Sequence, residues 1–280
     1  MENRSYLPYN RIMKYINSTL DYIQPTRQFS LSYIIIDSIL LSVFLFLLVY
    51  KKKTVVTIWA LFGGILYWIV DFGYFYLISH SREIYITTDA TGTILASTIE
   101  TMLVLFWMSM SYGILDFAFI WLWLSNDKDR KEFTWLIITF WCTTPLVSSV
   151  FDNSVPDMIY FTTTRSTGKY HGIMALIMLV GYLFLIIHNL FTKGEKADIG
   201  KIFLIGFMSQ FLWEFFLLVF NIRSTIYADD FRRQILTLLQ DSLIETNLGL
   251  PYMYFINRAV LKKISEKEKR KTEIQDQIEP

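Results

Sequence analysis

The stretch that decides the fold class is residues 31–50, which read LSYIIIDSILLSVFLFLLVY. A helix of about 20 apolar residues, rising roughly 1.5 Å per residue, crosses the hydrocarbon core of a bilayer. Six further blocks of this kind follow at 55–79, 97–124, 134–151, 171–191, 202–222 and about 236–257. These runs are too long and too continuous for transmembrane strands, and backbone groups in lipid need internal partners. We therefore expect an all-α membrane protein with seven transmembrane helices.

The composition agrees with this class. The 280 residues are 53% hydrophobic, and the mean hydropathy is +0.37, both unusual for a soluble domain. The net charge of +1 gives no reason to expect a nucleic-acid partner. Cys142 is the only cysteine, which excludes an intramolecular disulfide.

The distribution of Lys and Arg predicts the orientation. Sixteen of these residues fall on the side of the C-terminus and 10 on the other side, so the N-terminus is expected outside and the C-terminus in the cytoplasm. The last outer connection, with Arg223, Arg232 and Arg233, runs against this rule. Residues 1–30 form an extracytoplasmic or interfacial segment, either a helix on the membrane surface or a solvated tail. Residues 258–280 form a charged cytoplasmic tail.

Two segments of the chain repeat each other. Residues 99–108 read IETMLVLFWM and residues 244–253 read IETNLGLPYM, identical at six of ten positions. Upstream, Val70-Asp71-Phe72 corresponds to Trp213-Glu214-Phe215 at nearly the same offset.

This duplication predicts the domain organisation. Residues 31–124 form a first repeat of three helices, 134–151 a connector helix, and 171–257 a second repeat. An odd number of helices lies between each helix of the first repeat and its counterpart in the second, so both repeats cross the membrane in the same direction. The 3+1+3 repeat is therefore parallel, and sites in such proteins lie between the halves.

Carboxylates in the predicted spans mark the candidate site. A charged acid in the bilayer core costs roughly 2.5–3.5 kcal/mol, and no Lys or Arg lies in the central turns of any span. Buried carboxyls can hold a proton near neutrality and act as acids. The candidate catalytic residues are Asp71, Glu100, Asp116, Glu214 and Glu245.

Each acid also has a structural interpretation. Glu100 and Glu245 could be first-turn acids favoured by the helix dipole. Asp71 and Glu214 could hydrogen-bond a neighbouring helix, and Asp37 is expected to be structural. We predict that Asp71, Glu100, Glu214 and Glu245 converge on one cavity or two related ones, with Asp116 deeper.

Aromatic residues crowd these acids. Aromatic faces attract cations by about 0.5–2 kcal/mol, although most of the rings are also explained by packing and by the interfacial belt. The candidate substrate-binding residues are Trp68, Phe72, Tyr74, Trp107, Tyr112, Trp213, Phe215 and Asn247. His80, His171 and His188 lie apart in the sequence and show no metal-ligand spacing, and no phosphate-binding loop is present, so we expect neither a metal nor an organic cofactor.

The layout resembles a known group of membrane enzymes. Two three-helix copies, each with an aromatic-flanked acid in its second helix and a Glu at its third, resemble the membrane-integral lycopene cyclases of the two-domain type. Trp213-Glu214-Phe215 is similar to the Trp-Glu motif of the seven-helix meroterpenoid cyclases. The resemblance implies small, metal-free enzymes that start cyclisation with intramembrane acids.

The sequence thus favours an intramembrane terpenoid or carotenoid cyclase. A hydrophobic isoprenoid would enter from the bilayer, and Glu214 or Asp71 would protonate it. Glu100 and Glu245 would stabilise the carbocation, and one of these or Asp116 would accept the final proton. Two alternatives stay open: a small-molecule or lipid transporter built from the same repeat, and a membrane sensor or interaction protein without chemistry.

Overall fold

Helices long and apolar enough to cross a membrane dominate the fold. The structure, a computed structural model, describes residues 26–155, 157–165, 170–224 and 231–278. Six such helices lie in these ranges: α2 (Leu31–Tyr50), α3 with its π-helical continuation η1 (Thr54–Trp68 and Ile69–Ile78), α4 (Thr98–Leu124), α5 (Arg130–Asp152), α6 (His171–Phe191) and α7 (Ile199–Val219). The first six predicted spans are found, and the class of integral membrane protein follows from their length and apolarity. The surface helix considered in the N-terminal segment lies outside the described residues.

The seventh predicted span differs from the prediction. Residues 236–257 are divided between α8 (Phe231–Ile244) and α9 (Leu250–Ile278), with a turn at 245–249. Pro251 has no N–H to donate and is best accommodated in the first turn of a helix, and α9 starts just before it. Asn247 is fully buried in this turn. The count of seven crossings therefore stays a prediction.

Helix α4 is the centre of the bundle and is buried on most of its surface. It packs most closely on α3, where Gly63 and Gly64 face Gly113. A Cβ on Gly113 would lie 2.8 Å from the Gly64 Cα, so the two backbones touch. This close approach fixes α3 against α4 and sets the position of Asp71 one turn into η1.

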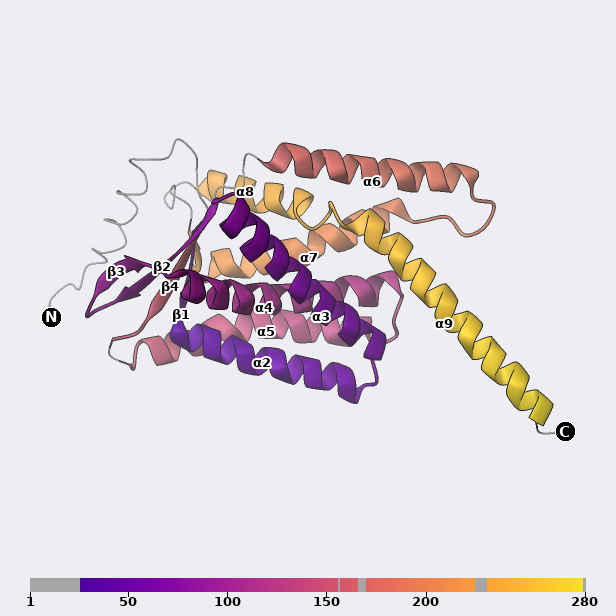
Figure 1. The fold of residues 1–280 in the computed structure, drawn as a ribbon, viewed down its shortest axis with the longest axis horizontal. Coiled ribbons are helices and arrows are strands. Elements are labelled where there is room, and N and C mark those ends of the chain that lie inside the picture. The colour runs from indigo at the N-terminus through magenta and orange to yellow at the C-terminus, as the bar shows by residue number, and fades with distance from the viewer. Residues whose placement is uncertain (1–25, 156, 166–169, 225–230, 279–280) are drawn as a thin grey trace.

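A five-stranded antiparallel sheet covers one end of the bundle, which the sequence did not lead us to expect (Figure 1). Its order is β3-β2-β4-β1-β5, with bounds Gly92–Leu95, Arg82–Thr88, Tyr160–Arg165, Thr26–Ser30 and Arg223–Ser224. We call this the sheet end; α9 runs away from the bundle at the opposite end (Figure 1). The strands are short connections rich in Thr, Tyr and Ile, which favour extended structure.

The sheet joins the two halves of the chain. Strand β1, from the first half, pairs with β4 and β5 from the second, and β2 pairs with β4. Arg82 lies directly opposite Arg165, and Arg27 lies directly opposite Arg223. Each half thus contributes two arginines to the sheet, and each pair of facing arginines contains one from each half.

Candidate functional site

Four arginines of the sheet, three of them buried and Arg165 half-buried, meet four carboxylates of the helices and of the turn after α8. We call these eight residues the arginine–carboxylate cluster: Arg27, Arg82, Arg165, Arg223, Asp71, Glu214, Asp241 and Glu245. Each arginine comes from a different strand, and each makes at least one ion pair with an acid. The cluster therefore carries equal numbers of positive and negative groups.

Glu214 is the most enclosed member and has no exposed surface. It accepts from Arg27 at 2.6 Å through Oε1 and from Arg223 through Oε2. Arg223 also contacts Asp241 at 2.5 Å. A charged group in a dry interior is tolerated only when it is paired and hydrogen-bonded, and Glu214 meets that condition on both oxygens.

Asp71 and Glu245 complete the cluster on either side. Arg82 contacts Asp71 at 3.0 Å, and the hydroxyls of Ser109 and Tyr112 donate to the other oxygen of Asp71. Glu245 accepts from Arg165.

Gln210 of α7 joins two of the three cluster acids of the second half. Its Nε2 donates to Glu214 at 3.1 Å and to Glu245 at 3.4 Å. Its Oε1 accepts from the Thr246 hydroxyl at 2.9 Å. The turn that follows α8 is therefore fixed to α7.

The pKa of each cluster arginine depends on burial, which lowers it, and on the neighbouring acids, which raise it. Burial lowers the pKa values of Arg27 and Arg82, and it lowers the pKa of Arg223 to about 10, against the opposing attraction of the neighbouring acids. For Arg165 burial also lowers the pKa, but the attraction of Glu245 and Asp241 outweighs it, and the pKa is raised. All four guanidinium groups remain cationic at neutral pH.

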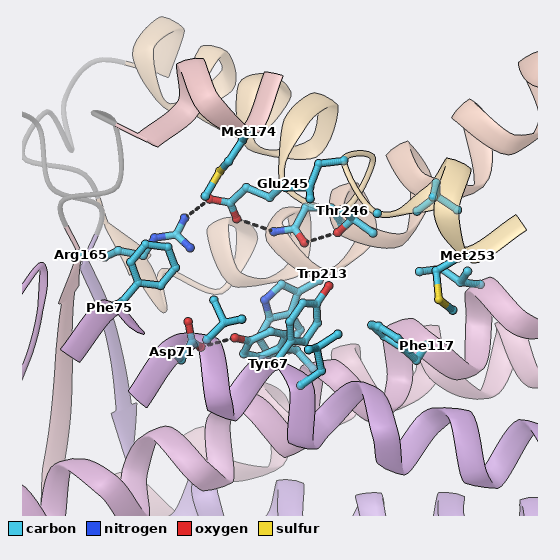
Figure 2. A pocket seen from close by; sticks show the side chains of 18 of the residues that line it. Tyr67, Asp71, Phe75, Phe117, Arg165, Met174, Trp213, Glu245, Thr246 and Met253 are labelled. Carbon is cyan, nitrogen blue, oxygen red and sulfur yellow. Dashed lines mark hydrogen bonds and ion pairs between the residues drawn. The ribbon is translucent and has the colours of Figure 1, made fainter. Parts of the chain in front are cut away.

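A mainly apolar cavity of about 260 Å³ lies directly beneath the cluster, between α3–η1 and the turn after α8 (Figure 2). Its polar end is formed by Arg27, Asp71, Arg165, Gln210 and Glu245. Its aromatic and apolar wall comprises Leu66, Tyr67, Val70, Phe75, Tyr112, Phe117, Ile120, Met174, Trp213, Leu248, Leu250 and Met253. The volume is just below the roughly 300 Å³ at which small-molecule pockets begin, so it fits one end of a long molecule.

The predicted acids are only partly brought together. Asp71 and Glu245 line the cavity, and Glu214 lies in the cluster behind it. Asp116 is fully buried near the cavity wall and accepts from Ser209 at 2.9 Å, while its Oδ2 has no hydrogen-bond partner among the described residues. Glu100 does not join them: it is exposed and forms a capping box with Ser97 at the start of α4.

Of the predicted substrate-binding residues, too, some line the cavity and others lie away from it. Only Tyr112 and Trp213 of that set line the cavity. The rings of Trp68 and Phe72 stack on each other, and Trp107 donates to Asp37 at 3.0 Å. The remaining three, Tyr74, Phe215 and Asn247, lie elsewhere: the first two are exposed, and the Asn247 amide contacts the Tyr182 hydroxyl at 3.0 Å.

Sequence reasoning missed the arginines that neutralise the acids. The expectation that ion pairing could not explain the intramembrane acids was wrong, because the cations come from the strands outside the helices and not from the spans. A signal was present: Arg223 was among the residues that ran against the charge rule for the outer side. An arginine that breaks this rule can be a buried partner of an acid and need not be a solvated loop residue.

Comparison of the chain with models of known protein families, with curated proteins and with solved structures found no match. The functional interpretation therefore rests on the site itself.

Proposed function

We propose that the protein is an intramembrane enzyme that cyclises a linear isoprenoid by proton addition and proton loss. The observation that carries this proposal is the apolar, aromatic cavity with carboxylates and tyrosines at one end. Such a cavity suits a reaction whose intermediate is a carbocation, because its apolar wall excludes water and its ring faces attract the cation, while Arg27 and Arg165 balance the two carboxylates at its polar end.

The residues that stabilise positive charge are those that line the cavity. Asp71 and Glu245 are the acidic halves of ion pairs with Arg82 and Arg165. The rings of Tyr67 and Trp213 lie between these acids and the apolar end (Figure 2), and Tyr112 also lines the cavity. A cation forming in the cavity would therefore meet two carboxylates and three rings.

The ion pairs change the assignment of the proton donor. Glu214 and Asp71 are occupied by arginines, so neither supports the role of acid. Among the described side chains no Lys or Arg contacts Asp116, which makes it the carboxyl suited to deliver the initiating proton. It lies one helical turn from Tyr112 on α4, which lines the cavity, whereas Asp116 itself is not a lining residue.

The reaction balances without a redox partner. The donated proton adds to a terminal alkene, a second alkene of the same chain attacks the cation to close a ring, and a proton returns to a carboxylate. Asp71 and Glu245 are the nearest acceptors on the cavity wall. The product is an isomer of the substrate.

Substrate access is supported from the side of the bundle. Leu66 and Val70 line the cavity and are also exposed on the outer face of α3 and η1. In a bilayer this face contacts lipid, so a prenyl chain could pass from the membrane into the cavity without crossing water.

The sheet supports the 3+1+3 parallel repeat as part of this proposal. The strand that precedes the first helix of each half carries one arginine, and the strand that follows the acid-bearing second helix carries another. In this interpretation α8 and the start of α9 together make the seventh crossing, the sheet lies outside and α9 ends in the cytoplasm.

A transporter is less well supported. In a transporter whose two halves rock against each other, the halves would separate at the sheet end. Strand β1 of the first half, however, pairs with both β4 and β5 of the second half. A continuous sheet across the halves favours a fixed site.

The test is mass spectrometry of lipids from cells that supply linear, epoxidised and carotenoid precursors, with and without the protein. We expect an isomer of one precursor with changed retention, lost with Asp116→Asn and reduced with Tyr112→Phe. Glu100→Gln, on the surface, is the matched control and should keep the product. No isomer from any precursor class, or an isomer that survives Asp116→Asn, would contradict the assignment.

A further inference from the structure

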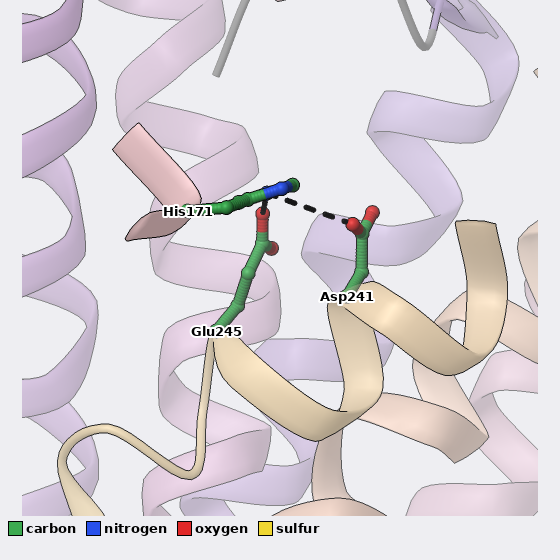
Figure 3. A group of neighbouring side chains, drawn as sticks. All are labelled: His171, Asp241 and Glu245. Carbon is green, nitrogen blue, oxygen red and sulfur yellow. Dashed lines mark ion pairs between the residues drawn. The ribbon is translucent and has the colours of Figure 1, made fainter. Parts of the chain in front are cut away.

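Three side chains that could bind a metal ion meet at the edge of the cluster, two of them its own carboxylates. His171 opens α6, Asp241 lies in the last turn of α8, and Glu245 follows the end of α8, four residues after Asp241 (Figure 3). Their candidate ligand atoms all lie within 4.8 Å of one another. Spacing of i and i+4 puts the two carboxylates on one face of the helix, directed at the imidazole.

The distances suit an ion better than a direct contact. The His171 Nε2 lies 3.9 Å from Asp241 Oδ1 and 3.9 Å from Glu245 Oε1, too long for hydrogen bonds. Two ligand atoms at about 2.0–2.2 Å from one tetrahedral ion are about 3.3–3.5 Å apart. A shift of roughly half an ångström closes the gap between His171 and each carboxylate, and the two carboxylate oxygens, which lie within 4.8 Å, must also approach each other.

The remaining contacts leave the three atoms available. Arg223 and Arg165 approach Asp241 through Oδ2, so Oδ1 is the oxygen that faces His171. Glu245 Oε1 accepts from Arg165, and a carboxylate oxygen has a second lone pair for an ion. The Gln240 Nε2 lies 2.8 Å from His171 Nδ1. An ion on Nε2 leaves the imidazole hydrogen on Nδ1, so the Gln240 amide must turn to present its oxygen, the kind of acceptor that orients a metal-bound imidazole.

We propose that His171, Asp241 and Glu245 form a site for a divalent transition metal, with Zn²⁺ the ion that fits best. One imidazole nitrogen and two carboxylate oxygens leave a fourth tetrahedral position open, the usual arrangement of three protein ligands in non-structural zinc sites. Arg165 shares Glu245 with the ion, so the site is weaker than one without a neighbouring cation. The ion would tie α6 to α8 and hold Glu245 at the polar end of the cavity.

The experiment is a Co²⁺ titration of the full-length protein, purified in detergent and stripped of metal with a chelator. We expect one Co²⁺ per chain, with visible absorption bands that Zn²⁺ displaces. His171→Gln should weaken binding by more than the roughly 10–100-fold that loss of an outer-shell partner causes. His188→Gln, on the same helix but outside the site, is the control and should bind as the wild type does.

Absence of stoichiometric Co²⁺ binding by the wild type, or equal binding by the wild type and His171→Gln, would overturn the proposal. None of these readouts depends on the cyclase activity.

Discussion

Asp71 is held by three residues from two other elements: Arg82 of β2 and Ser109 and Tyr112 of α4. A carboxylate buried at this depth is stable only because a guanidinium and two hydroxyls replace its water. The arginine is equally dependent on the acid, since only 2% of its surface is exposed. The pair is therefore a single unit in which neither charge can be removed alone.

Loss of Arg82 should be strongly destabilising. Arg82→Gln leaves Asp71 buried without a cation, and removing one partner of a buried pair costs about 3–5 kcal/mol. The measurement is the unfolding midpoint of the detergent-purified protein.

Two controls bracket this effect. The double variant Asp71→Asn/Arg82→Gln removes both charges and should recover much of the lost stability. Lys51→Gln breaks an exposed contact of 3.1 Å with Glu132 and should change stability by less than about 1 kcal/mol. Equal losses in Arg82→Gln and in the double variant would show that the pairing itself is not what stabilises Asp71.

Among the elements, the contact of α3 with α4 decides where the cavity lies. Residues of α3 and η1 form one wall of the cavity and α4 forms its floor, and the two helices touch through glycines. A wider spacing would move Tyr67 and Asp71 away from Tyr112. The glycines are thus important for the site although they do not line it.

A methyl group at the crossing should disturb it. In Gly113→Ala the Cβ would lie 2.8 Å from the Gly64 Cα and 2.9 Å from the Gly63 carbonyl, and backbone atoms cannot move aside cheaply. We expect destabilisation of about 1–3 kcal/mol, measured by thermal unfolding in detergent. Gly172→Ala, whose Cβ meets nothing within 4 Å, is the control and should be neutral or slightly stabilising. A neutral Gly113→Ala would show that the helices can separate without cost.

At the scale of the whole molecule, the hydrophobic blocks predicted six helices to within a few residues, because lipid imposes length and apolarity on any span. The last block failed as a continuous helix because Asn247 and Pro251 favour a turn that its apolarity hides. The sheet could not be foreseen, since its strands are short connections whose pairing joins segments far apart in the sequence.

The site was predictable only in its acids. Asp71, Glu214 and Glu245 do gather, because their polarity inside apolar spans requires a shared environment. Glu100 does not, since a Ser97 cap explains it locally. Arg27, Arg82 and Arg165 carry no mark in the sequence that distinguishes a buried partner from a solvated loop residue. Tyr67 and Gln210 likewise look like ordinary residues of a span until the helices are packed.

The central claim is that a proton delivered by the protein starts ring closure in the cavity. The most direct measurement is the reaction of purified protein in liposomes made with D₂O, followed by mass spectrometry of the product. Proton addition followed by loss of a different proton predicts a cyclic isomer that carries one deuterium from the solvent, absent with Asp116→Asn. A cyclic product without deuterium, or incorporation that Asp116→Asn leaves unchanged, would contradict the account.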